Sequence, residues 1–271
     1  MTRTRALPGL VVLAILFFNP IPWRHKKVHA VRDPVTLYNE GLAYMSDREG
    51  RLSFLHPPDY EKARKDFDEI LFDHPTSRFA PLAELRVADC YYESGEYESA
   101  APAYDNWRKN HVGRPEIPYV TYRVAMSYYH QILSIDRDQT TTRIALLEFQ
   151  NLVKNYPDSE YAGAVGDKAE ILRTRLAKHE FYVGQFYFRH HDYWAAIDRF
   201  QVILDNFPKK GLDEKALYWS WRSYKALGRR DQAEHAYNLL NERFPDGDLT
   251  RRAKLTRTEK SAKGAQKWLG Q

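Results

Sequence analysis

Five sets spread along the chain each place an alanine four residues before a Phe or Tyr ring. Positions i and i+4 lie on the same face of a helix, so each pair predicts the apolar stripe of an amphipathic helix. In four of the five sets a proline stands twelve residues after the alanine, and the residue before a proline avoids the α region, which ends the helix. The sets are Ala63–Phe67–Pro75, Ala100–Tyr104, Ala145–Phe149–Pro157, Ala196–Phe200–Pro208 and Ala233–Tyr237–Pro245.

The recurrence itself predicts a helical repeat array. The alanines are 37, 45, 51 and 37 residues apart, and periods of this size are typical of stacked helical hairpins. A small alanine lets a neighbouring helix approach closely, and burial of the aromatic ring one turn later contributes about 1.5–3 kcal/mol. The same spacing occurs on the second helix of the tetratricopeptide repeat. We therefore predict an all-α superhelical array of about five tetratricopeptide-like hairpins, which is a surface for binding other proteins.

The uneven spacing of the hairpins predicts two lobes. Helical patterning continues without a stop over residues 159–191, so we expect one long helix of roughly thirty residues to join the lobes. This places an N-terminal lobe at residues 33–157 and a C-terminal lobe at residues 158–248. Residues 249–271 hold seven Lys or Arg and one acid without an apolar face, and we predict a basic disordered tail there.

The first thirty residues are predicted to be an export signal or a membrane anchor. After a basic start, residues 6–18 form an apolar stretch of thirteen residues, the size of a signal core and short for a membrane span. Val28-His29-Ala30 offers a small-x-small cleavage site. The alternative is a retained apolar anchor that runs to Trp23.

The net charge is unevenly distributed. The two ends, residues 1–32 and 249–271, carry +6 each, so the +5 of the whole chain leaves −7 on the body between them. An acidic body argues against nucleic-acid binding. The basic tail is expected to contact an acidic partner or anionic lipid, or to remain solvated.

The sequence holds no recognisable catalytic set. It has no glycine-rich phosphate loop, G-x-S-x-G or H-E-x-x-H motif, so we predict no enzymatic activity and no cofactor. The single cysteine, Cys90, lies in an apolar run and is predicted to be an inert buried side chain. His190 and His191 are adjacent and therefore do not share a helix face, which favours a turn over a metal site. Asp136 and Asp138 alternate as in a calcium loop but lack its glycine and distant glutamate, so Asp138 is predicted to cap a helix.

Tyrosines concentrate on the expected first helices of the second and third hairpins. In helical arrays those helices line a concave groove, and most of the rings belong to the core. The rest, with two arginines, would hold an aromatic peptide and its terminal carboxylate, for which arginine offers a forked donor. The residues of this expected peptide groove are Arg86, Tyr91, Tyr92, Tyr122, Arg123 and Tyr129.

Five short motifs follow one another in the second half of the chain. They are Asp136-Arg137-Asp138-Gln139, Tyr156-Pro157-Asp158-Ser159-Glu160-Tyr161, Leu176-Ala177-Lys178-His179-Glu180, Phe186-Tyr187 and Tyr193-Trp194-Ala195-Ala196-Ile197-Asp198-Arg199-Phe200. In this order the set resembles the BamD family, the lipoprotein subunit of the outer-membrane β-barrel assembly machinery. The similarity covers residues 36–246.

The resemblance implies a periplasmic array against the inner face of the outer membrane. Its C-terminal repeats would dock on the barrel-forming subunit BamA, and its N-terminal repeats would receive unfolded outer-membrane proteins. Arg199 matches a family arginine that pairs with an acidic residue of that subunit, and we expect Asp198 and Arg189 to share this partner-binding surface. The alternative is a surface ion pair within the array, with Asp198 or Asp205 nearby.

The chain departs from the family pattern near the signal. Family members carry a lipobox cysteine, whereas Asn19-Pro20-Ile21-Pro22 stands near that place here. A retained anchor, a misassigned start or a soluble member would each account for the difference. A second function therefore stays open, that of a general periplasmic tetratricopeptide adaptor for envelope complexes without a role in barrel insertion.

Overall fold

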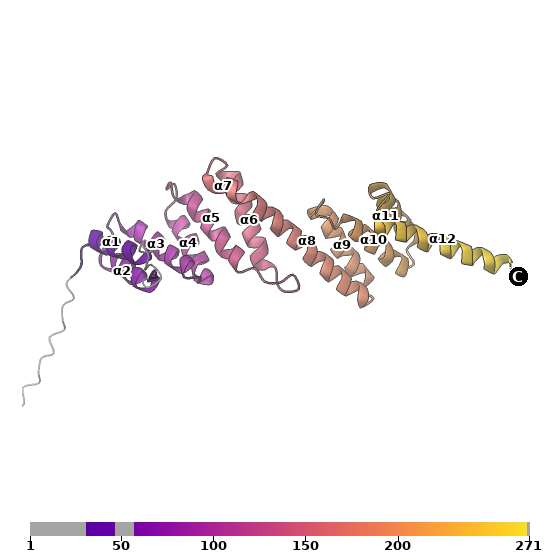
Figure 1. Ribbon diagram of the computed structural model, residues 1–271, viewed down its shortest axis with the longest axis horizontal. Helices are drawn as coiled ribbons and strands as arrows, with labels where there is room; N and C mark the ends of the chain where they lie inside the picture. Colours follow the sequence, from indigo (N-terminus) through magenta and orange to yellow (C-terminus); the bar gives the residue numbers. More distant parts are fainter. Residues whose placement is uncertain (1–30, 47–56, 270–271) are drawn as a thin grey trace, which may run out of the picture. The chain divides into compact units, whose positions relative to one another are not determined.

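The computed structural model describes residues 31–46 and 57–269, with side chains described up to residue 258. In this part of the chain every regular element is an α-helix (Figure 1), which confirms the predicted all-α class. The expected signal or anchor over residues 1–30 lies outside the described residues. The helices are α1 (Pro34–Met45), α2 (Tyr60–Asp73), α3 (Ala80–Glu93), α4 (Tyr97–Asn110), α5 (Ile117–His130), α6 (Thr140–Asn155), α7 (Glu160–Ala164), α8 (Gly166–Arg189), α9 (Tyr193–Asn206), α10 (Asp213–Ala226), α11 (Arg230–Arg243) and α12 (Asp248–Leu269).

Consecutive helices pair into hairpins, as the repeat predicted. The hairpins are α1–α2, α3–α4, α5–α6, α8–α9 and α10–α11. The second helix of each of the first four also packs on the next hairpin, as Figure 1 shows for α2 and α3. Each helix therefore lies against its neighbours in sequence, and the hydrophobic core runs as a series of adjoining clusters. The division into two lobes near residue 158 remains a prediction.

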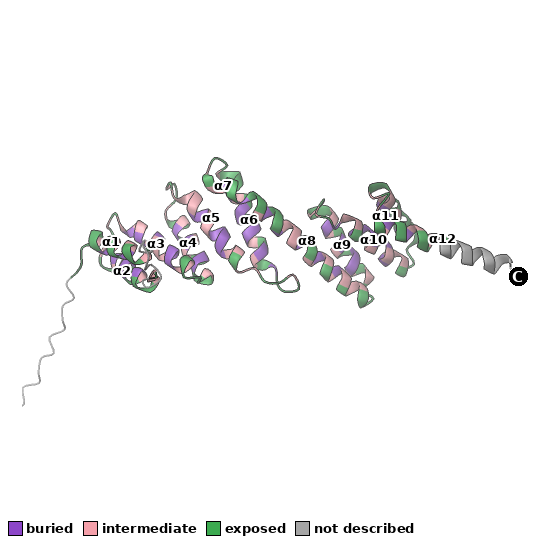
Figure 2. Ribbon diagram, in the orientation of Figure 1, coloured by how far each residue is buried: buried purple, intermediate pink, exposed green. Residues whose placement is uncertain are grey.

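The alanine–aromatic pairs form the interior of the array. Figure 2 shows buried positions on the facing sides of the helices. The ring of Phe67 packs so closely on α1 that a Cβ added to Gly41 would lie 2.6 Å from it, and a Cβ on Gly184 would lie 2.5 Å from Phe200. A glycine on the first helix thus makes room for the ring of the second. The pair residues with no exposed surface are Ala63, Phe67, Ala100, Tyr104, Ala145, Phe149, Ala196 and Phe200.

The expectation of one unbroken helix over residues 159–191 is wrong at Val165. Ser159 does begin a helix, since its hydroxyl accepts a bond from the Ala162 amide at 3.3 Å. That helix, α7, ends after five residues, and α8 then runs for 24 residues. Val165 is completely buried in the core cluster of α6 and α8. Gly163 and Gly166 flank it, and glycine costs helix stability, so the chain turns there.

The expected disordered tail is wrong over the first turns of α12. Ala253 and Thr250 are completely buried, and Leu249 packs on the last hairpin. Glu214 of α10 caps α12, because one of its oxygens accepts bonds from the amides of Leu249 at 2.8 Å and Thr250 at 3.2 Å. The cap comes from 35 residues away, so a local pattern of charge and hydropathy does not reveal it.

Candidate partner-binding site

The loop between α5 and α6 carries the first of the sequence motifs, and a buried glutamine shapes it. Gln139 is 1% exposed. Its amide nitrogen donates to the carbonyl oxygens of Ser134 at 2.9 Å and Arg137 at 3.0 Å, while its oxygen accepts from the Thr142 hydroxyl at 3.0 Å. Asp138 accepts from the Thr140 amide at 3.0 Å and so stabilises the start of α6. The loop is therefore held in one shape from within.

Helix α8 holds the same loop from outside. Nδ1 of His179 lies 2.6 Å from the carbonyl oxygen of Ile135, and the Arg175 guanidinium donates to the carbonyl of Leu133. On α8, His179 directly precedes Glu180 and Arg175 lies about one and a half turns before it. The motifs that end in Gln139 and Glu180 thus meet in space.

Glu180 is the centre of the site. The residue is 5% exposed and lies on α8. One of its oxygens is 3.1 Å from Arg199 of α9, and the other is 3.6 Å from Arg143 of α6. A buried carboxylate is costly unless it is paired with cations. Arg199 and Arg143 provide this pairing, so three helices contribute to one ionic cluster. Sequence reasoning found Arg199 but missed Glu180 and Arg143, although Glu180 closes one of the motifs.

The two arginines remain accessible while they neutralise this carboxylate. The side chain of Arg199 is 41% exposed and that of Arg143 is 53% exposed. Among the described residues Glu180 is the one carboxylate that forms an ion pair with either guanidinium, although Asp138 also attracts Arg143. Each guanidinium has five N–H donors in a fork that matches carboxylates. The arrangement can therefore bind an acidic side chain from outside.

The two other residues expected on this surface do not bond to Arg199. Asp198 and Arg189 are both exposed, but no bond among the described residues joins either to Arg199. Asp205 accepts from Gln201 at 2.9 Å. The surface ion pair expected as the alternative is thus replaced by the bond to Glu180.

A second buried carboxylate organises the expected peptide groove. Asp89 of α3 is 2% exposed. It lies 2.7 Å from Arg86, and it accepts from the hydroxyls of Tyr104 at 2.6 Å and Tyr119 at 2.7 Å. Arg123 donates to the Tyr119 hydroxyl at 2.9 Å, so Asp89 and Tyr119 link the two expected arginines. The sequence analysis did not single out Asp89. Its position as a charged residue within an apolar run was the signal that could have revealed it.

The charges of this network are balanced within the array. Burial, followed by the Asp89 carboxylate, raises the pKa of Tyr119 above its ordinary value, so its hydroxyl stays a donor. Arg123 also pairs with Glu93 at 2.9 Å. Two arginines therefore face two carboxylates. Next to Asp89, burial raises the pKa of the Cys90 thiol to about 12, which supports the prediction of an inert side chain.

The tyrosines of the expected groove are all half-buried. The ring of Tyr92 lies under the Arg123 guanidinium at 4.3 Å, and that of Tyr91 lies under Arg64 at 4.5 Å. Tyr122 stacks on Tyr161 with ring centroids 5.2 Å apart, and Tyr129 packs on Phe149 at 6.1 Å. These rings join neighbouring helices and remain partly exposed, so the groove assignment stays a prediction.

The histidine pair forms the turn between α8 and α9, as the sequence favoured. His190 follows the last residue of α8, and its Nδ1 lies 2.8 Å from the Phe186 carbonyl. His191 has a φ of 64°. The described residues include no group of three or more His, Cys, Asp or Glu placed to hold a metal ion. Across the same residues no helix has the length and apolarity to span a membrane.

Stacked helical hairpins that present charged clusters define a helical-repeat protein of the tetratricopeptide type. The sequence model of the YfiO family, described as an outer membrane lipoprotein, matches residues 49–239. The chain belongs to this family.

Relatives of the chain carry one recurring name. "Outer membrane protein assembly factor BamD" of Rickettsia prowazekii is 29% identical, over 91% of this chain and 94% of its own. The protein of the same name from Caulobacter vibrioides is 27% identical, over 80% of this chain and 68% of its own. Among solved structures, the TPR2AB domain of yeast Sti1 in its pHSP90 complex is 13% identical, covers 84% of this chain and 86% of that chain, and has a TM-score of 0.38. A score of this size carries no weight for fold or function.

Proposed function

We propose that this protein is a subunit of the outer-membrane β-barrel assembly complex that docks on the barrel-forming subunit through Arg199 and Arg143. Relatives over most of its length are named outer membrane protein assembly factors, which supports a place on the periplasmic face of the outer membrane. The observation that carries the proposal is the cluster of two accessible arginines on one buried carboxylate.

The docking role follows from the charge balance of that cluster. Glu180 fixes both guanidinium groups before a partner arrives, so little side-chain entropy is lost when an acidic residue binds. Truncating one member of a desolvated interfacial charge pair costs about 2–5 kcal/mol of binding free energy. A single acidic side chain of the barrel-forming subunit would neutralise the positive charge that Glu180 does not.

Receipt of unfolded barrel precursors is the second part of the proposal, and it concerns α3 and α5. Arg86 and Arg123 come together around Asp89 beside half-buried tyrosines. Each guanidinium has five N–H donors, and the side chain of Arg86 is 37% exposed while that of Arg123 is 21% exposed. The remaining donors suit a terminal carboxylate, and the ring edges suit an aromatic side chain.

A pull-down from detergent-solubilised envelope tests the docking role. We expect Arg199→Glu to lose the barrel-forming subunit, because the reversed charge repels an acidic partner. Lys154→Glu is the matched control, since Lys154 is an exposed cation on α6, the helix that carries Arg143. Equal recovery of the subunit with both variants would contradict docking at this site and would leave the general adaptor function.

The groove has its own test. We expect Arg86→Ala combined with Arg123→Ala to weaken binding of a peptide that ends in an aromatic residue and a free carboxylate. A peptide with an amidated end is the control, because it lacks the charge that the arginines would bind. Unchanged affinity for the free-carboxylate peptide would contradict the groove assignment while leaving the docking site untouched.

A further inference from the structure

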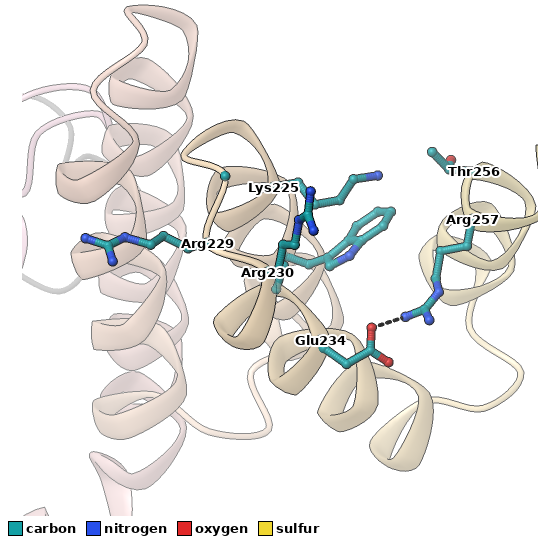
Figure 3. A pocket seen from close by; sticks show the side chains of 9 residues that line it. Lys225, Arg229, Arg230, Glu234, Thr256 and Arg257 are labelled. Carbon is teal, nitrogen blue, oxygen red and sulfur yellow. Dashed lines mark hydrogen bonds and ion pairs between the residues drawn. The ribbon is translucent and has the colours of Figure 1, made fainter. Parts of the chain in front are cut away.

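A cleft of about 560 Å³ opens between the last hairpin and α12. In Figure 3, Lys225 of α10 points toward the α12 side of this cleft, and Arg257 of α12 is bonded to Glu234 of α11. A second cleft adjoins it and shares Trp221, Lys225 and Thr256 as a common wall. Together the two clefts are lined by one carboxylate, that of Glu234, and by six cations. The cations are Arg222, Lys225, Arg229, Arg230, Arg252 and Arg257.

Aromatic rings hold several of these cations in place. The Arg222 guanidinium lies 4.7 Å from the ring centroid of Trp219, and the Lys225 ammonium lies 4.2 Å from that of Trp221. Figure 3 shows Arg229 pointing away from α12, where its guanidinium lies 5.6 Å from the ring of Trp194. A ring face attracts a cation without neutralising it. The positive charge of Arg222 therefore remains available to a ligand.

The cleft differs in this respect from the two clusters described above. Arg86, Arg123 and Arg199 each pair with a carboxylate. Within the described part of the chain, no carboxylate pairs with Arg222, Arg229, Arg230 or Arg252. Like charges crowded in a recess repel one another, so an anion that enters the cleft relieves this repulsion as well as forming new ion pairs.

We propose that this cleft binds an acidic segment of a partner polypeptide. The arginine forks suit carboxylates, and the half-buried rings of Phe188 and Tyr193 add an apolar wall to the second cleft. The surface is recessed, and a chain segment can enter a recess that a flat bilayer surface bridges. The cleft uses none of the residues of the Glu180 cluster, so it stands apart from the proposed docking site.

Fluorescence anisotropy with the full-length protein and a labelled glutamate-rich peptide tests this inference. We expect the double variant Arg230→Glu, Arg252→Glu to weaken binding by about tenfold or more, because two lining charges are reversed. Arg251→Glu is the matched control, since Arg251 neighbours Arg252 on α12 but pairs with Asp248 and does not line the cleft. We expect its affinity to stay within about twofold of the original.

A milder variant, added salt and two other ligands distinguish the possible outcomes. The milder double variant Arg230→Gln, Arg252→Gln should also weaken binding, and added salt should weaken binding to the original protein, because exposed charges are screened. A peptide with glutamine in place of glutamate should not bind. Equal loss with Arg251→Glu, or equal binding of the glutamine peptide, would overturn the inference. It would also be overturned if vesicles rich in phosphatidylglycerol bound through Arg230 and Arg252 while the acidic peptide did not.

Discussion

Asp89 and Glu180 are buried carboxylates that each bind arginine, and they differ in how their arginines are balanced and exposed. Asp89 joins α3, α4 and α5, and two tyrosine hydroxyls share it with Arg86. Glu180 joins α6, α8 and α9 through two arginines. The charges around Asp89 are balanced by Glu93, whereas Glu180 pairs with two accessible arginines. The same chemistry thus joins the helices at one hairpin junction and leaves accessible arginines at the other, where we propose that a partner docks.

The largest expected effect is on the Asp89 cluster. Asp89→Ala removes the carboxylate that three side chains use, and breaking a buried ion pair of this kind costs about 3–5 kcal/mol. Urea unfolding followed by circular dichroism measures the change. Asp89→Asn is the control, because the amide retains one acceptor oxygen and should cost less. If Asp89→Ala lowered the free energy of unfolding by less than a surface substitution does, Asp89 would not organise this junction.

A smaller loss of stability is expected at Glu180, with a larger loss of docking. Glu180→Gln removes the charge, but its arginine partners can turn to water, so we expect about 1–3 kcal/mol in unfolding free energy. Recovery of the barrel-forming subunit should fall as well, because the arginines are no longer held in place. If Glu180→Gln lowered stability without affecting recovery, the cluster would be structural, like that of Asp89.

The two clusters also differ in their response to alkaline pH. Burial, followed by the charge of Asp89, raises the pKa of Tyr104 and of Tyr119. The folded protein then holds these protons more tightly than the unfolded chain, so stability is complete below the ordinary tyrosine pKa of about 10 and falls above it, by at most about 1.4 kcal/mol per tyrosine and pH unit. Urea midpoints measured at increasing pH should decline less steeply in the variant Tyr104→Phe, Tyr119→Phe. An identical pH slope in both proteins would contradict this assignment.

The smallest effect is expected for an ion pair outside both clusters. Arg114 and Glu116 lie 3.3 Å apart before α5, and both side chains are partly exposed. Because water solvates both ions, Arg114→Ala should change the unfolding free energy by less than about 1 kcal/mol. Thermal unfolding checks this baseline. A change as large as that of Asp89→Ala would remove the distinction between buried and surface pairs.

The sequence alone predicts the array well because its signals are local. Phe67 and Phe149 lie one turn after an alanine, and both are fully buried where that spacing placed them. The break at Val165 depends on the core that receives its side chain. The start of α12 depends on a cap from Glu214, far away in the chain. Tertiary contacts of this kind do not appear in a local pattern.

The candidate site was predicted only in part for the same reason. Arg199 stands in a motif and could be singled out, but its partner Glu180 is 19 residues away on another helix. Arg143 joins them from a third helix and belongs to none of the motifs. A residue whose role depends on two other helices is recognised only once those helices are placed.

The charge reversal Arg143→Glu tests the central claim most directly, because only the geometry of the Glu180 cluster assigns Arg143 to the docking surface. The measurement is recovery of the barrel-forming subunit from solubilised envelope, compared with Arg199→Glu and with the control Lys154→Glu on the same helix as Arg143. We predict that Arg143→Glu loses the subunit as Arg199→Glu does. Recovery equal to that of Lys154→Glu would contradict the account.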